Sequence, residues 1–132
     1  MVDDESRRSG SAIGVEALRG HVIGCAIAVH TALGPGFREP VYRRALELEL
    51  DHIGVPFASE LGITVSYRAR PVGTHRLDLL VASSVVLELK AVPAIERLHV
   101  AQVLAYLRAS GCRLGFVLNF GAATLGIRRV VL

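Results

Sequence analysis

Two residues of opposite charge interrupt one of the most apolar stretches of the sequence. Glu88 and Lys90 lie two positions apart within residues 85–92, a segment rich in Val and Leu that predicts a β-strand. Because side chains alternate across a strand, Glu88 and Lys90 share one face, whereas Leu89 points to the other. An unpaired charge inside an apolar element is costly, so both side chains require partners.

A second carboxylate, Asp78, lies in the apolar run 76–81. The polar turn 82–84 separates this run from residues 85–92, which predicts a central hairpin with Asp78 and Glu88 as neighbours. Adjacent carboxylates repel each other unless a cation or a proton neutralises them, and their oxygens suit Mg²⁺ or Mn²⁺. Lys90 could then orient a metal-bound water. On the charges alone, a structural ion pair between Lys90 and either carboxylate explains the pattern equally well.

The rest of the sequence predicts the elements that position these residues. Apolar residues at helical spacing indicate helices over residues 15–33, 39–53 and 94–110, each followed by a glycine. Strands are expected at residues 55–60, 63–67, 76–81, 85–92, 114–120 and 127–132, with residues 68–73 as a connection. The predicted fold class is α/β, a central mixed β-sheet flanked by helices in the order α-α-β-β-β-β-α-β-β.

The composition predicts one domain and a nucleic-acid partner only weakly. The chain has 132 residues, 52% of them hydrophobic, which suffices for one core. We expect a flexible tail at residues 1–12 and a single domain at residues 13–132. The net charge of +3 weakly favours phosphate-bearing partners. Arg68, Arg70 and Arg76 could form a local basic surface, although solvated charge explains them equally well.

The start of the chain and its apolar runs bear on location. The first residues are acidic, which contradicts a secretory signal, and no apolar run reaches the ~18 residues that a membrane helix needs. We therefore expect a cytoplasmic protein without membrane contact.

The acidic pattern resembles that of RecB-type members of the PD-(D/E)XK nuclease superfamily, whose signature is D…ExK…QxxxY. The matching residues in chain order are Asp78, Glu88, Lys90, Gln102 and Tyr106. The resemblance implies a restriction-endonuclease-like core and a Mg²⁺ or Mn²⁺ centre formed by the two carboxylates and the Leu89 carbonyl. It also implies that Gln102 and Tyr106, which share one helix face, contact a nucleic-acid backbone.

Residues 36–42 are similar to the motif that names the GxxExxY protein family, which is assigned to the same superfamily. The similarity covers nearly the whole chain and implies that Glu39 is a further acidic residue of the metal centre. A carboxylate that interacts with a helix dipole is the alternative for Glu39. Tyr42 either orients Glu39 at the substrate or packs. His30 is a metal ligand or phosphate contact by resemblance to RecB-type nucleases, or it caps the carbonyls of a helix end.

Together with the charges, the two resemblances imply a metal-dependent nuclease that hydrolyses phosphodiester bonds in DNA or RNA through Asp78, Glu88, Lys90 and Glu39. The alternative is a non-catalytic nucleic-acid- or protein-binding module that retains the nuclease fold, because a fold does not determine an activity. The small size leaves little surface for sequence readout beside the centre, which makes a homodimer or a partner protein plausible.

Overall fold

Five strands form one mixed sheet, in the order β1-β2-β3-β4-β5, in the computed structural model, which describes residues 14–132. The strands are β1 (Phe57–Tyr67), β2 (Arg70–Val81), β3 (Val85–Lys90), β4 (Leu114–Asn119) and β5 (Gly126–Val131). β3 and β4 are parallel, and every other neighbouring pair is antiparallel. The tail expected at residues 1–12 lies outside the described residues.

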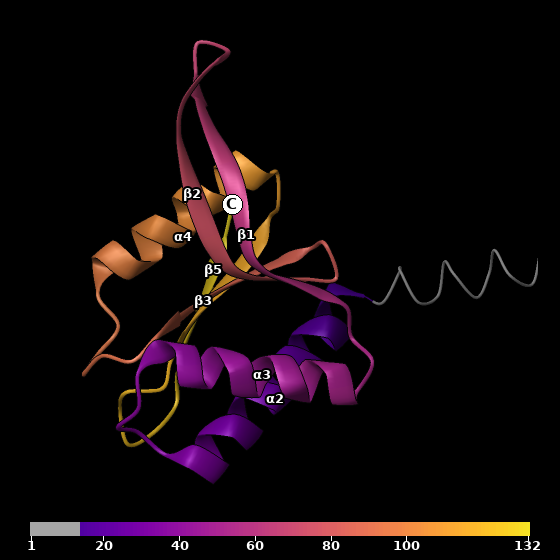
Figure 1. Ribbon diagram of the computed structural model, residues 1–132, viewed down its shortest axis with the longest axis vertical. Helices are drawn as coiled ribbons and strands as arrows, with labels where there is room; N and C mark the ends of the chain where they lie inside the picture. Colours follow the sequence, from indigo (N-terminus) through magenta and orange to yellow (C-terminus); the bar gives the residue numbers. More distant parts are fainter. Residues whose placement is uncertain (1–13) are drawn as a thin grey trace, which may run out of the picture.

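Three helices cover the two faces of this sheet (Figure 1). α2 (Val15–Leu33) and α3 (Glu39–His52) pack together on one face, over a core that includes Leu79, Leu87 and Phe116. α4 (Arg97–Ser110) packs on the other face, over Val86 and Val117. Because β3 and β4 are parallel, the chain needs a crossover between them, and α4 supplies it. The expected fold class, a mixed sheet flanked by helices, is confirmed.

Local sequence fixes where the helices begin and end. Gly34, with a φ of 67°, ends α2, and Pro40 lies in the first turn of α3, where its missing N–H costs nothing. α4 begins at Arg97 rather than at residue 94. The reason is a capping box at the first turn. The Glu96 side chain accepts the backbone N–H of His99, and the His99 side chain accepts the backbone N–H of Glu96.

The expectation of two short strands at residues 55–60 and 63–67 is wrong, because residues 57–67 form the single strand β1 and residues 55 and 56 precede it. Pairing with β2 continues on both sides of Glu60, through Ser59 with Leu79 and Leu61 with Leu77. The connection expected at residues 68–73 is wrong as well. Arg68 and Ala69, both with positive φ, form a tight turn, and β2 begins at once at residue 70. The element order is therefore α-α-β-β-β-α-β-β.

Helices cross a membrane only when they are long and predominantly apolar. None of those in the described part of the chain is both long and apolar enough to cross a membrane.

Candidate metal centre

Asp78 and Glu88 meet at the point where β2 and β3 separate. The two strands pair over residues 79–81 and 85–87. One residue further on, Oδ2 of Asp78 accepts the backbone N–H of Leu89 at 2.8 Å. In a continued antiparallel ladder, a main-chain carbonyl of β2 would accept this bond. The carboxylate thus replaces a ladder bond at the place where the sheet opens.

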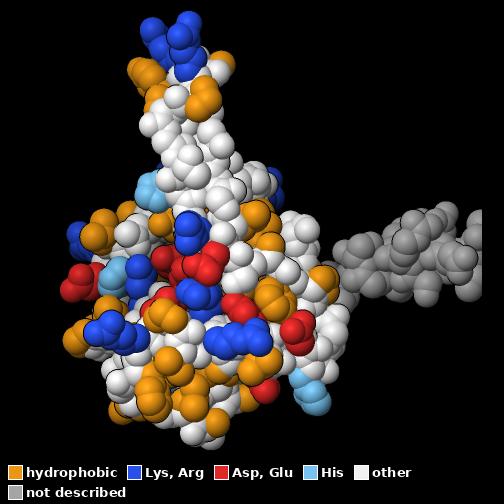
Figure 2. Space-filling model, viewed as in Figure 1, with side chains coloured by type: hydrophobic (Ala, Val, Ile, Leu, Met, Phe, Trp, Pro, Cys, Tyr) orange, Lys and Arg blue, Asp and Glu red, His pale blue; other side chains and the backbone are white. Residues whose placement is uncertain are grey.

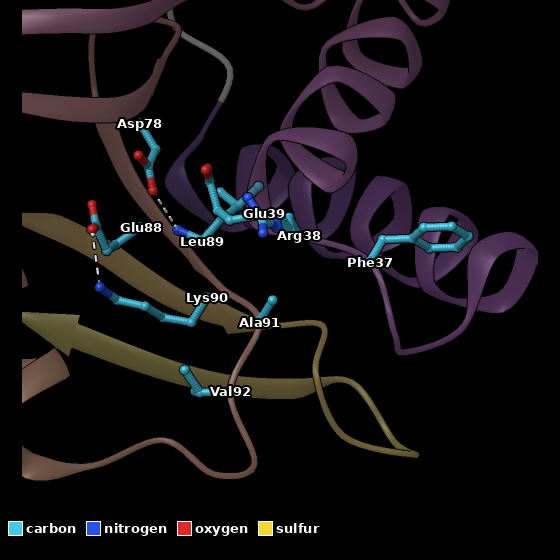
Figure 3. A pocket seen from close by; sticks show the side chains of 9 residues that line it. All are labelled: Phe37, Arg38, Glu39, Asp78, Glu88, Leu89, Lys90, Ala91 and Val92. Atoms are coloured by element: carbon cyan, nitrogen blue, oxygen red, sulfur yellow. Dashed lines mark hydrogen bonds and ion pairs between the residues drawn. The ribbon is translucent and has the colours of Figure 1, made fainter.

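A cavity of about 470 Å³ lies at this opening (Figure 3). Its three carboxyl groups come from three different elements, with Asp78 from β2, Glu88 from β3 and Glu39 from the first turn of α3. The residues that line it are Phe37, Arg38, Glu39, Asp78, Glu88, Leu89, Lys90, Ala91 and Val92. The hairpin therefore brings the two strand carboxylates together as expected, and α3 adds the third.

Glu88 is the most constrained of these groups. Its side chain is buried, and Oε2 lies 3.4 Å from Nζ of Lys90. Within residues 14–132, its other oxygen, Oε1, is buried without any hydrogen-bond partner. Burial first, and the charge of Asp78 second, raise the pKa of Glu88 to about 7. A buried carboxylate oxygen without a partner is costly, so this position calls for a proton or a cation.

The other two carboxyl groups experience the same environment. Burial raises the pKa of Asp78, although the N–H of Leu89 and the charge of Lys90 oppose the change. Burial also raises the pKa of Glu39, and the nearby charge of Asp78 adds to the effect. The charge of Asp78 therefore disfavours ionisation of both Glu39 and Glu88, which is the pattern expected of a cation site.

Two cations already pair with carboxyl groups of the cavity. Lys90 Nζ donates a hydrogen bond to Oε1 of Gln102 on α4 at 3.2 Å. Arg43, one turn after Glu39 on α3, lies 3.3 Å from Glu39, 3.6 Å from Glu47 and 3.6 Å from Glu60. Lys90 therefore holds Glu88 from the α4 side of the sheet, and Arg43 holds Glu39 from the α3 side.

The donor chemistry fits a hard divalent cation, but the side chains are not arranged around one. In residues 14–132, no three His, Cys, Asp or Glu side chains converge as a metal cage. The ion pairs of Arg43 with Glu39 and of Lys90 with Glu88 explain this arrangement. Asp78 and Glu88 nevertheless supply oxygen ligands, and the Leu89 carbonyl faces β2 because the N–H and C=O of a strand residue face the same neighbour.

Two of the four residues expected to contact substrate lie on α4, on the side of Lys90. Gln102 reaches the cavity through Lys90. Tyr106, one turn later on α4, is largely buried, and its ring centroid lies 5.6 Å from that of His75. Burial, followed by the charges of Glu88 and Asp78, raises the pKa of Tyr106. Gln102 and Tyr106 thus lie between the acidic groups and the body of α4.

His30 and Tyr42 lie apart from the cavity wall. Nε2 of His30 is 2.9 Å from the carbonyl oxygen of Ala122, so it joins the end of α2 to the loop between β4 and β5. Tyr42 is fully buried; its hydroxyl donates to the carbonyl of Gly34 at 2.6 Å and accepts the N–H of Phe37 at 3.1 Å. Both side chains therefore hold loops in place.

Sequence reasoning missed two supports of the centre. Arg43 gave no signal of its role, because its contact with Glu60 depends on how α3 packs against β1. Asn119 is buried at the end of β4, where its side chain accepts the N–H of Val92 at 3.0 Å and donates to the carbonyl of Val92 at 2.9 Å. A polar residue at the end of an otherwise apolar strand was the available signal. Asn119 fixes the backbone just beyond Lys90.

The fold and the cavity together define an α/β domain of the restriction-endonuclease-like class. The chain belongs to the PD-(D/E)XK nuclease superfamily, whose family model matches residues 16–130. The solved structure titled "Crystal structure of SSO0001" is similar in fold, with a TM-score of 0.55 and 16% sequence identity over 70% of this chain and 48% of that chain. The chain thus spans about half the length of that structure. A comparison with curated proteins gave no match.

Proposed function

We propose that this protein is a metal-dependent nuclease that hydrolyses phosphodiester bonds in DNA or RNA at the cavity around Asp78 and Glu88. The observation that carries the proposal is the buried Oε1 of Glu88, which lacks a hydrogen-bond partner within residues 14–132, beside the partly buried carboxyl group of Asp78. A divalent cation would satisfy this oxygen and remove the repulsion between the carboxylates. Asp78, Glu88, Glu39 and the Leu89 carbonyl would hold Mg²⁺ or Mn²⁺.

When bound, such an ion supplies Lewis-acid activation of water and of the phosphodiester. Lys90, which lies 3.4 Å from Glu88, would orient the attacking water or stabilise negative charge that develops on the phosphate. Gln102 positions the ammonium group of Lys90, because its Oε1 accepts a hydrogen bond from Nζ at 3.2 Å. Gln102 and Tyr106 would then fix the substrate backbone from α4.

In the proposed nuclease, Tyr42 and His30 would hold loops near the cavity in place. Tyr42 holds residues 34–37, and His30 holds the loop at residue 122. We infer from Gly36, Glu39 and Tyr42 that the chain falls in the GxxExxY group of the superfamily. The function of Tyr42 in that group would be to hold the turn that presents Glu39.

The test is cleavage of labelled single-stranded and duplex DNA and RNA with Mg²⁺ or Mn²⁺. We expect the wild type to cut, and Asp78→Ala and Lys90→Ala to lose at least about a hundredfold in rate, the range for electrostatic and positioning groups. Asp51→Ala, which changes an exposed aspartate at the end of α3, is the matched control and should cut like the wild type. Cleavage that survives in both centre variants would disprove the proposal.

Metal binding is measurable without any activity, because Lys90 is the single lysine of the chain. Protein labelled with ¹⁵N and ¹³C on lysine gives one set of side-chain signals, and bound Mn²⁺ should broaden them at substoichiometric amounts. The broadening should disappear in the double variant Asp78→Asn, Glu88→Gln. Equal broadening in the wild type and the double variant would place the ion elsewhere.

The non-catalytic binding module is the second candidate, and one observation favours it. Arg43 and Lys90 already pair with Glu39 and Glu88, so part of the negative charge is neutralised by the protein itself. This candidate predicts no cleavage with any metal, no lysine broadening specific to the centre, and nucleic-acid or protein binding that weakens with salt.

A further inference from the structure

The outer part of the β1–β2 hairpin extends beyond the rest of the sheet as a two-stranded arm (residues 64–74; Figure 1). β2 pairs with β3 only from residue 79 onward among the described residues, so the arm strands pair with each other. Residues 66–74 are all exposed. At about 3.3 Å per residue, the four residues of β1 and the five residues of β2 in the arm give a projection of roughly 15 Å.

The chemistry of the arm is basic and apolar. Arg68 and Arg70 lie at its tip, beside Tyr67 and Val72, which are 66% and 63% exposed (Figure 2). No aspartate or glutamate occurs in residues 61–77. Arginine with an adjacent exposed aromatic ring is the combination that binds phosphates and nucleic-acid surfaces. The tip is therefore complementary in charge to a polyanion.

The turn that presents the first arginine is conformationally unfavourable for its residues. Arg68 and Ala69 have φ values of 51° and 64°, in the left-handed region. Two-residue turns of this kind favour Asn-Gly, because other residues with a Cβ cost about 1 kcal/mol there. The chain thus carries a charged side chain at the apex, where turn stability alone would select asparagine.

The base of the arm packs against α4 and adjoins the candidate metal centre. Ile63 packs in the core beneath α4, and His75 lies against Tyr106. Asp78 follows on β2, and Glu60, on β1, lies between the pairs that flank Asp78. A molecule held by the arm therefore lies next to the acidic cavity, and Figure 2 shows acidic and basic side chains gathered at the base of the arm.

We propose that the arm binds duplex DNA by entering the major groove, with Arg68 and Arg70 on the phosphates that border it. The B-form major groove, about 12 Å wide, admits a two-stranded β-ribbon such as the arm. The major groove of A-form RNA is too deep and narrow for side chains to read. Duplex DNA would then be the substrate of the proposed nuclease, so this consequence rests on the proposed function. The binding of DNA by the arm can be tested without it.

The test is equilibrium binding, measured by fluorescence anisotropy on labelled DNA and RNA duplexes of one sequence in EDTA, where no cleavage occurs. The variant Arg68→Asn, Ala69→Gly, Arg70→Thr removes both charges and installs the favoured turn. We expect it to unfold at the same or a higher temperature and to bind duplex DNA roughly tenfold or more weakly. The slope of log K against log salt should fall by about two, one for each lost phosphate contact.

The matched control is Arg128→Ser, Arg129→Ser, which removes two exposed charges from β5 at the opposite edge of the sheet. It should keep wild-type affinity, and wild type should prefer the DNA duplex to the RNA duplex. Equal losses in both variants, equal binding of DNA and RNA, or unchanged binding in the arm variant would each overturn the inference. Arm-dependent binding without cleavage would refute the nuclease proposal alone; Asp78-dependent cleavage with arm-independent binding would refute the arm alone.

Discussion

At the scale of single residues, Glu88 has the least favourable electrostatic environment of the three carboxyl groups in the cavity. It is buried, one oxygen lies near Lys90, and the other is without a partner among the described residues. Its ordinary pKa is 4.5 and its pKa in the folded chain is about 7. Without a metal, the folded protein therefore binds a proton at Glu88 over a range of pH in which the unfolded chain has lost it.

This difference has a defined sign. Between about pH 4.5 and pH 7 the folded state holds more protons at Glu88 than the unfolded state, so the free energy of unfolding falls as pH rises through this window. The loss is complete above pH 7 and amounts to about 1–3 kcal/mol. Asp78 and Glu39, whose pKa values are also raised, change stability in the same direction.

We predict that Glu88→Gln is more stable than the wild type at pH 8 in EDTA and close to it at pH 4.5. The amide keeps the shape of the side chain but cannot acquire the buried charge. Urea unfolding at the two values of pH measures the effect, with Glu49→Gln, outside the cavity, as the control. If the gap between Glu88→Gln and the wild type does not grow with pH, Glu88 does not titrate as described.

Arg43 is the second residue whose role is testable by itself. Its side chain is 18% exposed and lies among three carboxylates. Arg43→Met leaves these charges without their shared cation, and we expect the free energy of unfolding to fall by about 1–3 kcal/mol. Arg44→Met is the neighbouring control. Arg44 is 65% exposed, pairs only with Glu47 among the described residues, and should change stability by less than about 1 kcal/mol.

The variant Arg43→Met also tests whether Glu39 binds the metal ion. Loss of Arg43 frees Glu39, so Mg²⁺ should restore more stability to Arg43→Met than to the wild type, measured as the shift in melting temperature. Equal shifts in both proteins would exclude Glu39 from the ion's ligands.

At the scale of elements, the end of β3 depends on a close approach to the loop after β4. A Cβ on Gly121 would lie 2.4 Å from the nitrogen and 2.5 Å from the oxygen of Val92, both main-chain atoms that cannot turn away. Asn119 holds the same residue by two hydrogen bonds. Together these contacts set the path of the chain immediately after Lys90.

We predict that Gly121→Ala lowers the free energy of unfolding by about 3 kcal/mol, because the backbone must shift, and that it weakens cleavage through displacement of Lys90. Gly24→Ala is the control, on α2, where no described atom lies within 4 Å of the added Cβ. It should stabilise the protein by about 0.5–1 kcal/mol. A Gly121→Ala protein as stable as the wild type would show that the loop adjusts freely.

Element by element, the sequence predicts the centre of the sheet well and its margin poorly. β3 and β4 are dense in Val and Leu and buried on both faces, so composition alone places them, and the register of Asp78 and Glu88 follows from the short turn. Composition does not predict the strands of the arm. Pro71 and Gly73 favour a loop, but an exposed two-stranded ribbon tolerates both, because each strand has a free edge.

The contacts of the candidate centre divide in the same way. The proximity of Asp78 and Glu88 depends on one hairpin and is predictable from local sequence. The contact between Arg43 and Glu60, and the hold of Asn119 on Val92, join elements that are distant in the chain. No local periodicity encodes such contacts, because they arise only once α3 and β4 are packed.

At the scale of the whole molecule, the turn at Arg68 and Ala69 divides the chain into two parts of similar size. The first part contains α2, α3 and β1 with Glu39 and Glu60, and the second contains β2 to β5 and α4 with Asp78, Glu88 and Lys90. A chain opened at this exposed turn keeps the β1–β2 pairing and the core beneath α2 and α3 as its joining surface. The two halves, made as separate polypeptides, are thus a natural pair for fragment complementation, in which the acidic cavity exists only when they reassemble.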